Sequence, residues 1–529
     1  MARVVVTTAG GVRGRLPERG VVAFRSIPYA AAPVGALRFA APAPVAPWTG
    51  VRQARDPGPV APQDPRSGYG WNAGSGDDHL TLDVFVPERF PRDLPVLVWI
   101  HGGGWVTGSG SAPGYFPAAW VAQGFVVVTL NYRLGFEGFG SVEGAPENRG
   151  LLDQVAALRW VQENVTAFGG DPARVTIAGE SAGAASVAAL LGAPAARGLF
   201  SRAIASSITG ETYTVAQARR VAARIASAAR VPNTLAGLGG LPPLRLLAAT
   251  ASVAEDLAAD GAAEGAPRDP RSLVPLLFHP VVDGDLVRGP YSEGPDGGGD
   301  PAVELLVGTQ ADEWTLFSRS GFAPRPSTGA ELAVYAASVG LGPEGVSRYR
   351  ELMPGASPAA VADALLTDAL FAEPSRRFAR RHTDRGGVTF LSRFTWRSPA
   401  FGGRFGATHA LDVPFAFGSP VAMEPFLHAV PVLPLARRLP LVGPRVRGVW
   451  PTPSAAALSR RMVSAWTGFA RDGDPGWPAL APDGTPVHVW GARDRLEAEP
   501  DPRTAIWAGV GFAPYDGVPA AGASVAAEA

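Results

Sequence analysis

The 529-residue sequence contains no cysteine, and all 47 of its basic side chains are arginine because lysine is absent as well. Without cysteine there can be no disulfide bridge, no thiolate metal ligand and no cysteine nucleophile. Without lysine there is no side-chain amine for a Schiff base and no P-loop lysine for phosphate. These absences exclude several classes of catalytic and metal site.

An excess of one charge and long apolar runs are also missing. The 47 basic residues balance 47 acidic ones, and no long run of either sign stands out. A nucleic-acid-binding surface is therefore not expected, and neither is polybasic attraction to a membrane. No apolar stretch reaches the roughly 18 residues of a membrane span, and the first residues do not read as a signal peptide. We therefore expect a cytoplasmic protein without nucleic-acid or membrane partners.

The length of the chain admits two organisations. Single hydrophobic cores stop growing at about 250–300 residues, so two domains or one elaborated domain would both fit. With 46% hydrophobic and 18% charged residues, the composition is that of a globular protein. We predict one elaborated α/β domain over residues 1–513, with helical insertions around 320–385 and 425–455 that shape a cap or gorge. The Ala- and Gly-rich residues 514–529 are predicted to form a flexible tail.

Short apolar runs alternate with helical patterns along the chain. The runs are interpreted as buried strands over residues 95–100, 125–130, 174–177, 303–308 and 388–394. Continuous apolar strands of this kind suit a parallel sheet that is covered on both faces. The clearest helical pattern covers residues 151–168, where apolar side chains recur at helical spacing. The alternation of strands and helices predicts an α/β fold with a large, mostly parallel central sheet.

One segment matches the G-x-S-x-G pattern of a nucleophile elbow, Gly179-Glu180-Ser181-Ala182-Gly183. In such a turn the serine stands between a strand and a helix, and the flanking glycines let the two approach closely. An apolar run precedes the segment and a run of small residues follows it. The start of a helix beside the serine also favours negative charge there. The pattern alone can arise by chance in a Gly-rich chain, but this context favours Ser181 as a nucleophile.

A second glycine-rich segment, His101-Gly102-Gly103-Gly104-Trp105, follows the strand predicted over residues 95–100. Glycines let backbone N–H groups turn toward a ligand without a side chain in the way. In HGGG-type segments one oxyanion donor lies in this loop, and another is the residue after the nucleophile. We therefore predict Gly103, Gly104 and Ala182 as oxyanion donors, with His101 shaping the loop.

A serine nucleophile of this kind needs an acid and a histidine that follow it in the chain. Of the seven histidines, His409 is favoured as the base because it lies in a loop of small residues soon after the strand predicted over 388–394. Asp312 and Glu313 follow the strand predicted over 303–308, where a carboxylate can orient a histidine. The pattern alone does not choose between these two acids.

Further segments carry a family resemblance over nearly the whole chain. They are Ile27-Pro28-Tyr29-Ala30, Pro33-Val34-Gly35-Ala36-Leu37-Arg38-Phe39, Pro47-Trp48, Asn148-Arg149-Gly150-Leu151-Leu152-Asp153-Gln154, Phe168-Gly169-Gly170-Asp171-Pro172, Pro280-Val281-Val282-Asp283-Gly284 and Gly473-Asp474-Pro475. Together with the elbow they resemble the type-B carboxylesterases, which include the cholinesterases and bacterial para-nitrobenzyl esterases and have the α/β-hydrolase fold.

The resemblance implies a catalytic triad of Ser181, Glu313 and His409. It selects Glu313 because the acid of the family is the Glu of an Asp-Glu pair at this point. It supports the same three oxyanion donors, and it implies that Glu180, before the nucleophile, faces the site and acts through its charge.

The sequence also departs from the family pattern. Asp78-His79-Leu80 stands where the family has Asp-Cys-Leu, so the usual first disulfide is absent, as in an intracellular bacterial enzyme. Trp314 replaces the usual Gly after the acid. Trp71 lies near the position of the cation-binding Trp of cholinesterases, where an aromatic ring can hold a quaternary ammonium or anchor a loop. Together with Trp105 and Phe317, these aromatic residues predict an apolar substrate pocket.

The expected activity is hydrolysis of small-molecule carboxylic esters through an acyl-enzyme on Ser181, with no cofactor and no metal. The same site chemistry serves amide, carbamate, lactone and thioester hydrolysis, and the sequence separates these bonds poorly. A non-catalytic binding protein of the same fold is the alternative from another class. The sequence does not distinguish a monomer from a homodimer.

Overall fold

The computed structural model describes residues 3–89, 91–263, 276–291, 299–320, 325–418, 452–481, 486–498 and 501–511. A sheet of eleven strands runs through this described part of the chain, in the order β16-β15-β14-β13-β10-β9-β7-β8-β6-β4-β3. The strands are β3 (Arg15–Glu18), β4 (Val21–Pro28), β6 (Thr81–Pro87), β7 (Leu94–Ile100), β8 (Val126–Leu130), β9 (Gly170–Glu180), β10 (Arg202–Ser206), β13 (Glu304–Gln310), β14 (Thr389–Phe394), β15 (Val487–Trp490) and β16 (Arg495–Glu497).

The strands from β8 to β15 pair in parallel, whereas both edges of the sheet are antiparallel. The strands at the centre are buried along almost their whole length, as β7 and β8 show. Parallel strands need a crossover connection, and here helices supply it. The predicted α/β fold with a mostly parallel central sheet is therefore confirmed.

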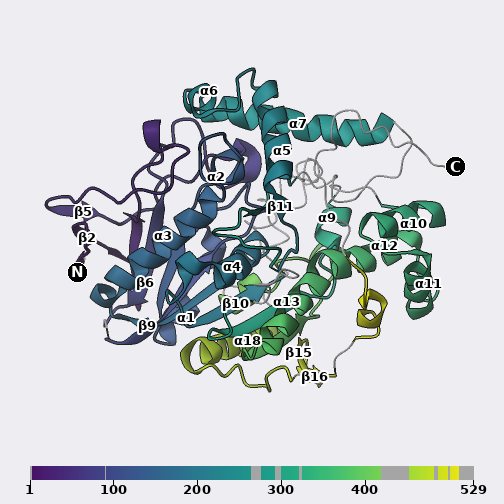
Figure 1. Cartoon of the computed structure of the whole chain (residues 1–529). Helices are drawn as coiled ribbons and strands as arrows, with labels where there is room; N and C mark the ends of the chain where they lie inside the picture. The colour runs from purple at the N-terminus through teal and green to yellow at the C-terminus, as the bar shows by residue number, and fades with distance from the viewer. Residues whose placement is uncertain are drawn as a thin grey trace.

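Two hydrophobic cores cover the two faces of the sheet. Side chains alternate between them along β7, so Val98 belongs to the first core and Trp99 to the second. The first core is completed by α3 (Arg149–Asn164), α4 (Ala182–Gly192), α5 (Val215–Ala228) and α7 (Pro243–Ala263). The second is completed by α1 (Ala118–Ala122), α14 (Val413–Ala416) and α18 (Pro453–Asp472). In Figure 1, α5 and α7 lie toward the top of the view and α18 lies toward the bottom, with strands such as β10 between them.

Helix α3 illustrates how the sequence sets the elements. Its apolar residues Leu151, Val155 and Leu158 recur at helical spacing and are buried in the first core. A 3₁₀ turn over Val165–Phe168 continues the helix. The turn ends at Gly169, which has a φ of 88° that glycine adopts without strain. The helix thus delivers the chain directly into β9, at whose end the nucleophile is predicted.

A third, smaller core lies beside the sheet and is built mainly of helices. Its elements are α9 (Thr315–Arg319), α10 (Gly329–Ser338), α11 (Pro343–Leu352), α12 (Pro358–Thr367) and a π-helical turn over Asp368–Ala372 that leads into α13 (Glu373–Asp384). Figure 1 shows α10, α11 and α12 gathered at one side of the molecule. We call this cluster of buried side chains the satellite core; it includes Trp314, Tyr349 and Leu365. It lies in the stretch for which the sequence predicts a helical insertion.

The C-terminal segment 501–511 closes the satellite core. Trp507 is 1% exposed and packs into it, and its Nε1 donates a hydrogen bond of 2.8 Å to the Tyr349 hydroxyl. That hydroxyl donates in turn to Asp368 Oδ2 at 2.5 Å. At the start of the segment, Asp501 pairs with Arg393 of β14 at 2.6 Å. The predicted insertion around 425–455, up to residue 451, and the predicted tail over 514–529 lie outside the described residues.

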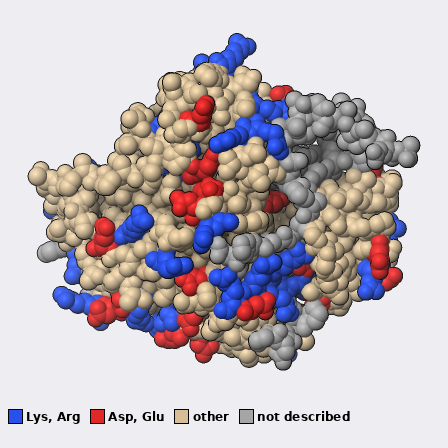
Figure 2. Space-filling view, in the orientation of Figure 1, with Lys and Arg blue, Asp and Glu red and all other residues tan. Residues whose placement is uncertain are grey.

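The other described strands and α-helices complete the fold. They are β1 (Val4–Val6), β2 (Gly11–Arg13) and β5 (Val51–Gln53) in one small sheet, β11 (Tyr213–Thr214) and β12 (Val281–Val282) in another, and the helices α2 (Gly135–Phe139) and α6 (Leu235–Gly239). Arginine and acidic side chains are interspersed over the face drawn in Figure 2. Of the helices that the structure describes, none combines the length and the apolar character needed to cross a membrane.

Candidate active site

Ser181 stands at the junction of β9, which ends at Glu180, and α4, which begins at Ala182. Its backbone has a φ of 57° and a ψ of −125°, a conformation that residues with a Cβ rarely adopt and that costs about 1–3 kcal/mol. Two hydrogen bonds hold the turn, from Ser181 N–H to Ser206 C=O and from Ala185 N–H to Ser181 C=O, both 2.9 Å. The strained turn lifts the serine out of the line of the strand.

The two glycines of the elbow are required by close packing. A Cβ on Gly179 would lie 2.5 Å from the carbonyl carbon of Gly183, and a Cβ on Gly183 would lie 2.2 Å from the carbonyl oxygen of Ile100. Neither position can hold a larger residue unless the backbone moves. The end of β9, the start of α4 and the end of β7 therefore meet at backbone contact beneath Ser181.

The loop after β7 lies against the elbow. A Cβ on Gly102 would lie 3.2 Å from the Cβ of Ser181. Gly103 and Gly104 have φ values of 106° and 62°, which only glycine adopts readily. Among the described residues, no acceptor is found for the N–H groups of Gly103, Gly104 and Ala182. These three backbone donors, in the elbow and in the loop that lies against it, therefore remain available to a ligand, as an oxyanion hole requires.

His101 is held as part of the frame of this loop. Its ring stacks on Tyr132 at 4.5 Å, and its Nδ1 lies 2.8 Å from the Gly102 carbonyl oxygen. The Tyr132 hydroxyl donates to the His101 carbonyl at 2.9 Å. Burial lowers the pKa of His101 to about 4, so the ring is neutral at pH 7.

Glu313 and His409 come together although they lie far apart in the chain. His409 Nδ1 is 2.6 Å from Glu313 Oε2. The other carboxylate oxygen, Oε1, accepts hydrogen bonds from the Gln310 N–H at 2.7 Å and the Ser207 hydroxyl at 2.6 Å. Glu313 is wholly buried. Three donors thus hold the carboxylate in one orientation toward the imidazole, and the neighbouring Asp312 makes no such contact with His409 among its described hydrogen bonds.

The second imidazole nitrogen faces Glu180. His409 Nε2 lies 3.1 Å from Glu180 Oε1. Burial raises the pKa of Glu180 to about 8, although the charge of His409 opposes this. Burial works to lower the pKa of His409, but the carboxylates of Glu180 and Glu313 outweigh it and raise the pKa to about 9. Ser181 Oγ has no hydrogen-bond partner within the described residues.

Three polar residues of this cluster were missed by the sequence analysis. Ser207 binds Glu313, as described above. Ser206 donates to Asp412 Oδ2 at 2.5 Å, and burial raises the pKa of Asp412 to about 6. The available signals were a serine pair after the short apolar run Ala203–Ala205 and an acid three residues after His409. Neither matches a general pattern, because these residues act through a spatial neighbour.

Aromatic rings cover the imidazole on the side of the satellite core. Phe371 and Phe317 have ring centroids 4.6 and 5.5 Å from that of His409, and they stack on each other at 6.0 Å. Phe317 was expected at the substrate pocket, whereas Phe371 was not identified. Trp314 is buried in the satellite core, with its ring 5.1 Å from Phe317. It therefore packs against the ring of Phe317 from within the satellite core.

The two other tryptophans predicted to bind substrate are buried. Trp105 is 1% exposed, packs in the first core against Phe139 and donates from Nε1 to Ser186 at 3.2 Å. This packing anchors the loop after β7 that carries Gly103 and Gly104, which we call the oxyanion loop. A contact of Trp105 with substrate stays a prediction. Trp71 is 5% exposed. A contact between its ring and a cation stays a prediction as well.

A cavity of about 210 Å³ opens beside the elbow and the loop that carries His409. Its wall includes Glu180, next to the nucleophile, and Ala410, next to the histidine. The rest is mostly apolar or small, with Tyr69, Tyr115 and Val413 as its larger members. Among the described residues, no group of three or more His, Asp and Glu side chains is arranged to hold a metal ion.

Comparison with known proteins agrees with this geometry. The model of the carboxylesterase family matches residues 1–339. A para-nitrobenzyl esterase of Bacillus subtilis is 34% identical over 94% of this chain and 97% of its own length, and a phenmedipham hydrolase of Pseudarthrobacter oxydans is 35% identical over 92% and 94%. Among solved structures, a carboxylesterase of Geobacillus stearothermophilus has a TM-score of 0.79 and 34% identity, covering 95% of this chain and 99% of that one. The chain therefore belongs to the carboxylesterase family and is a carboxylic ester hydrolase with the α/β-hydrolase fold.

Proposed function

We propose that this carboxylesterase hydrolyses uncharged, moderately sized esters by two-step acyl transfer on Ser181, with His409 as general base and acid and Glu313 as its partner. The observation that carries the proposal is the 2.6 Å contact between Glu313 and His409, which lies beside the Ser181 elbow. In this arrangement the carboxylate sets the tautomer of the imidazole and stabilises the imidazolium that forms.

The first step forms the acyl-enzyme. Ser181 Oγ attacks the ester carbonyl carbon while its proton passes to His409 Nε2, and the carbonyl oxygen becomes an oxyanion. Collapse of this intermediate breaks the bond to the alcohol oxygen, which takes the proton from His409 and leaves. Water then repeats the sequence on the acyl-enzyme and releases the carboxylic acid.

For this step His409 Nε2 must exchange its contact with Glu180 for one with Ser181 Oγ. Catalytic hydrogen bonds often tighten only once substrate is bound. The exchange also requires a neutral imidazole, because an imidazolium has no lone pair to accept the serine proton. Glu180 is thus assigned a role in holding the imidazole and setting its charge.

The oxyanion is assigned to the N–H groups of Gly103, Gly104 and Ala182. Loss of one such donor typically lowers turnover by about 10²–10³. Their support is the geometry of the loop, in which glycines with positive φ leave N–H groups without acceptors in the described structure.

The substrate class follows from the cavity beside Glu180. At about 210 Å³ and with a mainly apolar wall, it suits one small or medium-sized uncharged group of an ester rather than a charged one. We include in the proposal a cytoplasmic location in a bacterium, which is supported by the similar bacterial proteins and is testable by cell fractionation.

The test is hydrolysis of para-nitrophenyl esters of increasing acyl length by the wild type beside Ser181→Ala. We expect activity in the wild type alone, with a chain-length profile that reports the size of the acyl site. An equally active Ser181→Ala protein would overturn the assignment. A folded wild type that cleaves none of these esters would favour amide, carbamate, lactone or thioester substrates, or a non-catalytic role.

A further inference from the structure

Glu313 and His409 are carried by two connections that are tied to each other by polar contacts. We call residues 311–319 the acid turn and residues 404–409 the histidine loop. The acid turn follows β13 closely, whereas the histidine loop comes well after β14, which ends at Phe394. No helix or strand that the structure describes ends next to His409. Its position must therefore be fixed by contacts between the histidine loop and the acid turn.

Asp312 makes the central contact. Its N–H donates to the Ala407 carbonyl at 3.0 Å, and its Oδ2 accepts from the Ala407 N–H at 2.8 Å. Arg397 Nη1 reaches the same carboxylate oxygen at 2.8 Å. Asp312 therefore satisfies both polar groups of a buried residue that lies two positions before the catalytic histidine, from a position directly before the catalytic acid.

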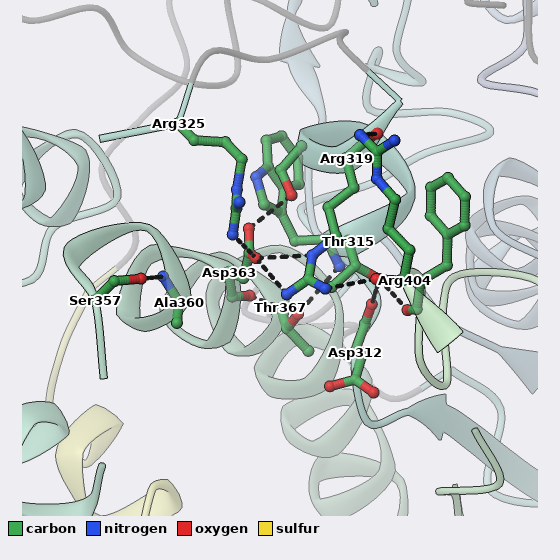
Figure 3. A network of polar contacts seen from close by, with 12 residues as sticks. Asp312, Thr315, Arg319, Arg325, Ser357, Ala360, Asp363, Thr367 and Arg404 are labelled. Carbon is green, nitrogen blue, oxygen red and sulfur yellow. Dashed lines mark hydrogen bonds and ion pairs between the residues drawn. The ribbon is translucent and has the colours of Figure 1, made fainter. Parts of the chain in front are cut away.

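Thr315 adds a second contact beside the first. Its hydroxyl lies 2.6 Å from the carbonyl oxygens of both Asp312 and Phe405 and 3.0 Å from the Thr408 hydroxyl. A hydroxyl has one proton, so it donates to one of these three oxygens at a time. Figure 3 shows Thr315 and Asp312 at one end of this polar network.

A third contact closes the far end of the two connections. Arg319 and Arg404 each donate from the guanidinium to the backbone carbonyl of the other. Arg319 also pairs with Asp363 of α12 at 3.2 Å, which fastens the network to the satellite core, as Figure 3 shows. The contacts run in opposite order along the two connections, Asp312 with Ala407, Thr315 with Phe405 and Arg319 with Arg404, and together they act as a clasp of three successive links.

Gly406 is shaped for this clasp. It has a φ of 67°, and a Cβ there would lie 2.4 Å from Asp312 Oδ2 and 2.8 Å from Arg397 Nη2. The space beside the histidine loop is thus filled by the Asp312 carboxylate and its arginine partner, and the loop has no freedom to shift toward them.

We propose that Asp312 and Thr315 are positioning residues that set the distance and orientation between Glu313 and His409. The inference rests on the roles proposed above for those two residues. Loosening the clasp lengthens the Glu313–His409 contact, which weakens the general base and removes part of the electrostatic support of the imidazolium. Binding of the ester at Ser181 and in the cavity is left largely unchanged.

The test compares Asp312→Ala with Asp312→Asn. The alanine variant loses the acceptor for the Ala407 N–H, whereas the amide oxygen of asparagine keeps it. We expect kcat of Asp312→Ala to fall about 100-fold with KM little changed, since a displacement of about 1 Å at a reacting group can cost this much. Asp312→Asn should recover most of the loss.

The matched control is Asp494→Ala. Asp494 has a similarly exposed side chain, 19% against 23% for Asp312, and it also accepts from an arginine and a backbone N–H, those of Arg461 and Gly491. It lies in the turn between β15 and β16, away from the acid turn. Its removal should leave kcat within about threefold of the wild type. The same kcat loss in both alanine variants would reduce Asp312 to general stabilisation.

The pH profile separates positioning from a merely structural role. A longer Glu313–His409 contact lowers the pKa of His409, so the acid limb of kcat/KM should move to lower pH in Asp312→Ala. Partial unfolding would lower activity without moving that limb. Thr315→Val should show a smaller loss and Thr315→Ser none, with thermal melting followed in parallel.

One outcome would reject the positioning role of the clasp, and another would reject the proposed roles of Glu313 and His409. If Asp312→Ala keeps the kcat and acid limb of the wild type while His409→Ala is inactive, the clasp is wrong and the roles of Glu313 and His409 stand. If His409→Ala itself keeps activity, the proposed function fails first.

Discussion

Ser181 and the oxyanion loop are held by backbone packing, whereas Glu313 and His409 are held by side chains that join two separate connections. On the serine side, β9, α4 and the loop after β7 meet at distances that admit only glycine. On the histidine side, Asp312 and Thr315 bridge to a loop that no regular element fixes. The serine side joins two short glycine-rich segments by backbone contact. The histidine side depends on side-chain contacts between its two connections, and Glu313 and His409 are 96 residues apart.

This difference explains how the two halves tolerate change. Backbone packing leaves few alternatives, since any added atom collides. Side-chain ties can be weakened in steps and partly restored by a similar residue. A similar residue should therefore not rescue a substitution of a serine-side glycine, whereas on the histidine side Asp312→Asn should recover most of what Asp312→Ala loses.

The largest effect is expected from Glu313→Gln, which breaks the histidine side at its centre. The amide cannot stabilise the imidazolium, and it favours the wrong tautomer of His409. We expect kcat to fall by about 10³–10⁴, as for loss of the carboxylate in other serine triads. Initial-rate assays with a para-nitrophenyl ester measure the change in kcat. Glu497→Gln, on an exposed strand, serves as the control. If Asp312→Asn abolished turnover and Glu313→Gln did not, the assignment of the acid would be reversed.

A somewhat smaller effect is expected from Gly103→Ala on the serine side. The new Cβ would lie 2.1 Å from the Thr107 carbonyl oxygen, so the loop must move and the oxyanion donors move with it. We expect kcat to fall by about 10²–10³. Gly198→Ala is the matched control, because Gly198 also has a positive φ but its Cβ would meet open space. Equal losses in the two variants would show that backbone strain, not the donors, lowers the rate.

The smallest effect is a shift of the pH profile in Glu180→Gln. Activity requires neutral His409, so it rises as pH increases through the pKa of the imidazole. The carboxylates raise that pKa above its ordinary value of 6.5, to about 9. Removing the Glu180 charge should lower it, so the acid limb of kcat/KM should move to lower pH by about one unit. An acid limb that stays in place would show that Glu180 does not set the charge of His409.

The contrast between the two sides also sets how much the sequence could predict. The elbow, the oxyanion loop and the parallel strands could be predicted from the sequence, because each depends on a short pattern of glycines or apolar residues. The choice of Glu313 over Asp312 needed the family resemblance, since two adjacent carboxylates look alike in a sequence. Ser207 and Asp412 were not found, because their partners lie far away in the chain.

The aromatic residues also show how far the sequence alone can predict the site. Trp105, Trp314 and Phe317 were expected together at a pocket because they lie near catalytic segments. The structure buries the two tryptophans as supports and leaves only Phe317 of these three against His409. Whether an aromatic ring faces substrate or core depends on which elements pack behind it, and the sequence near the motif does not contain that information.

The packing of Trp507 in the satellite core bears on the order in which the enzyme matures during synthesis. A chain leaves the ribosome from its N-terminus, and its early segments can fold first. The sheet strands that flank the elbow are complete once β10 and β13 have emerged. The satellite core, which holds Trp314 next to Glu313 in the chain, lacks the buried indole of Trp507 until residue 507 has been made. The satellite core is therefore incomplete until residue 507 has been made. We expect a chain truncated before residue 501 to form the elbow at Ser181 but to leave the histidine side without this support.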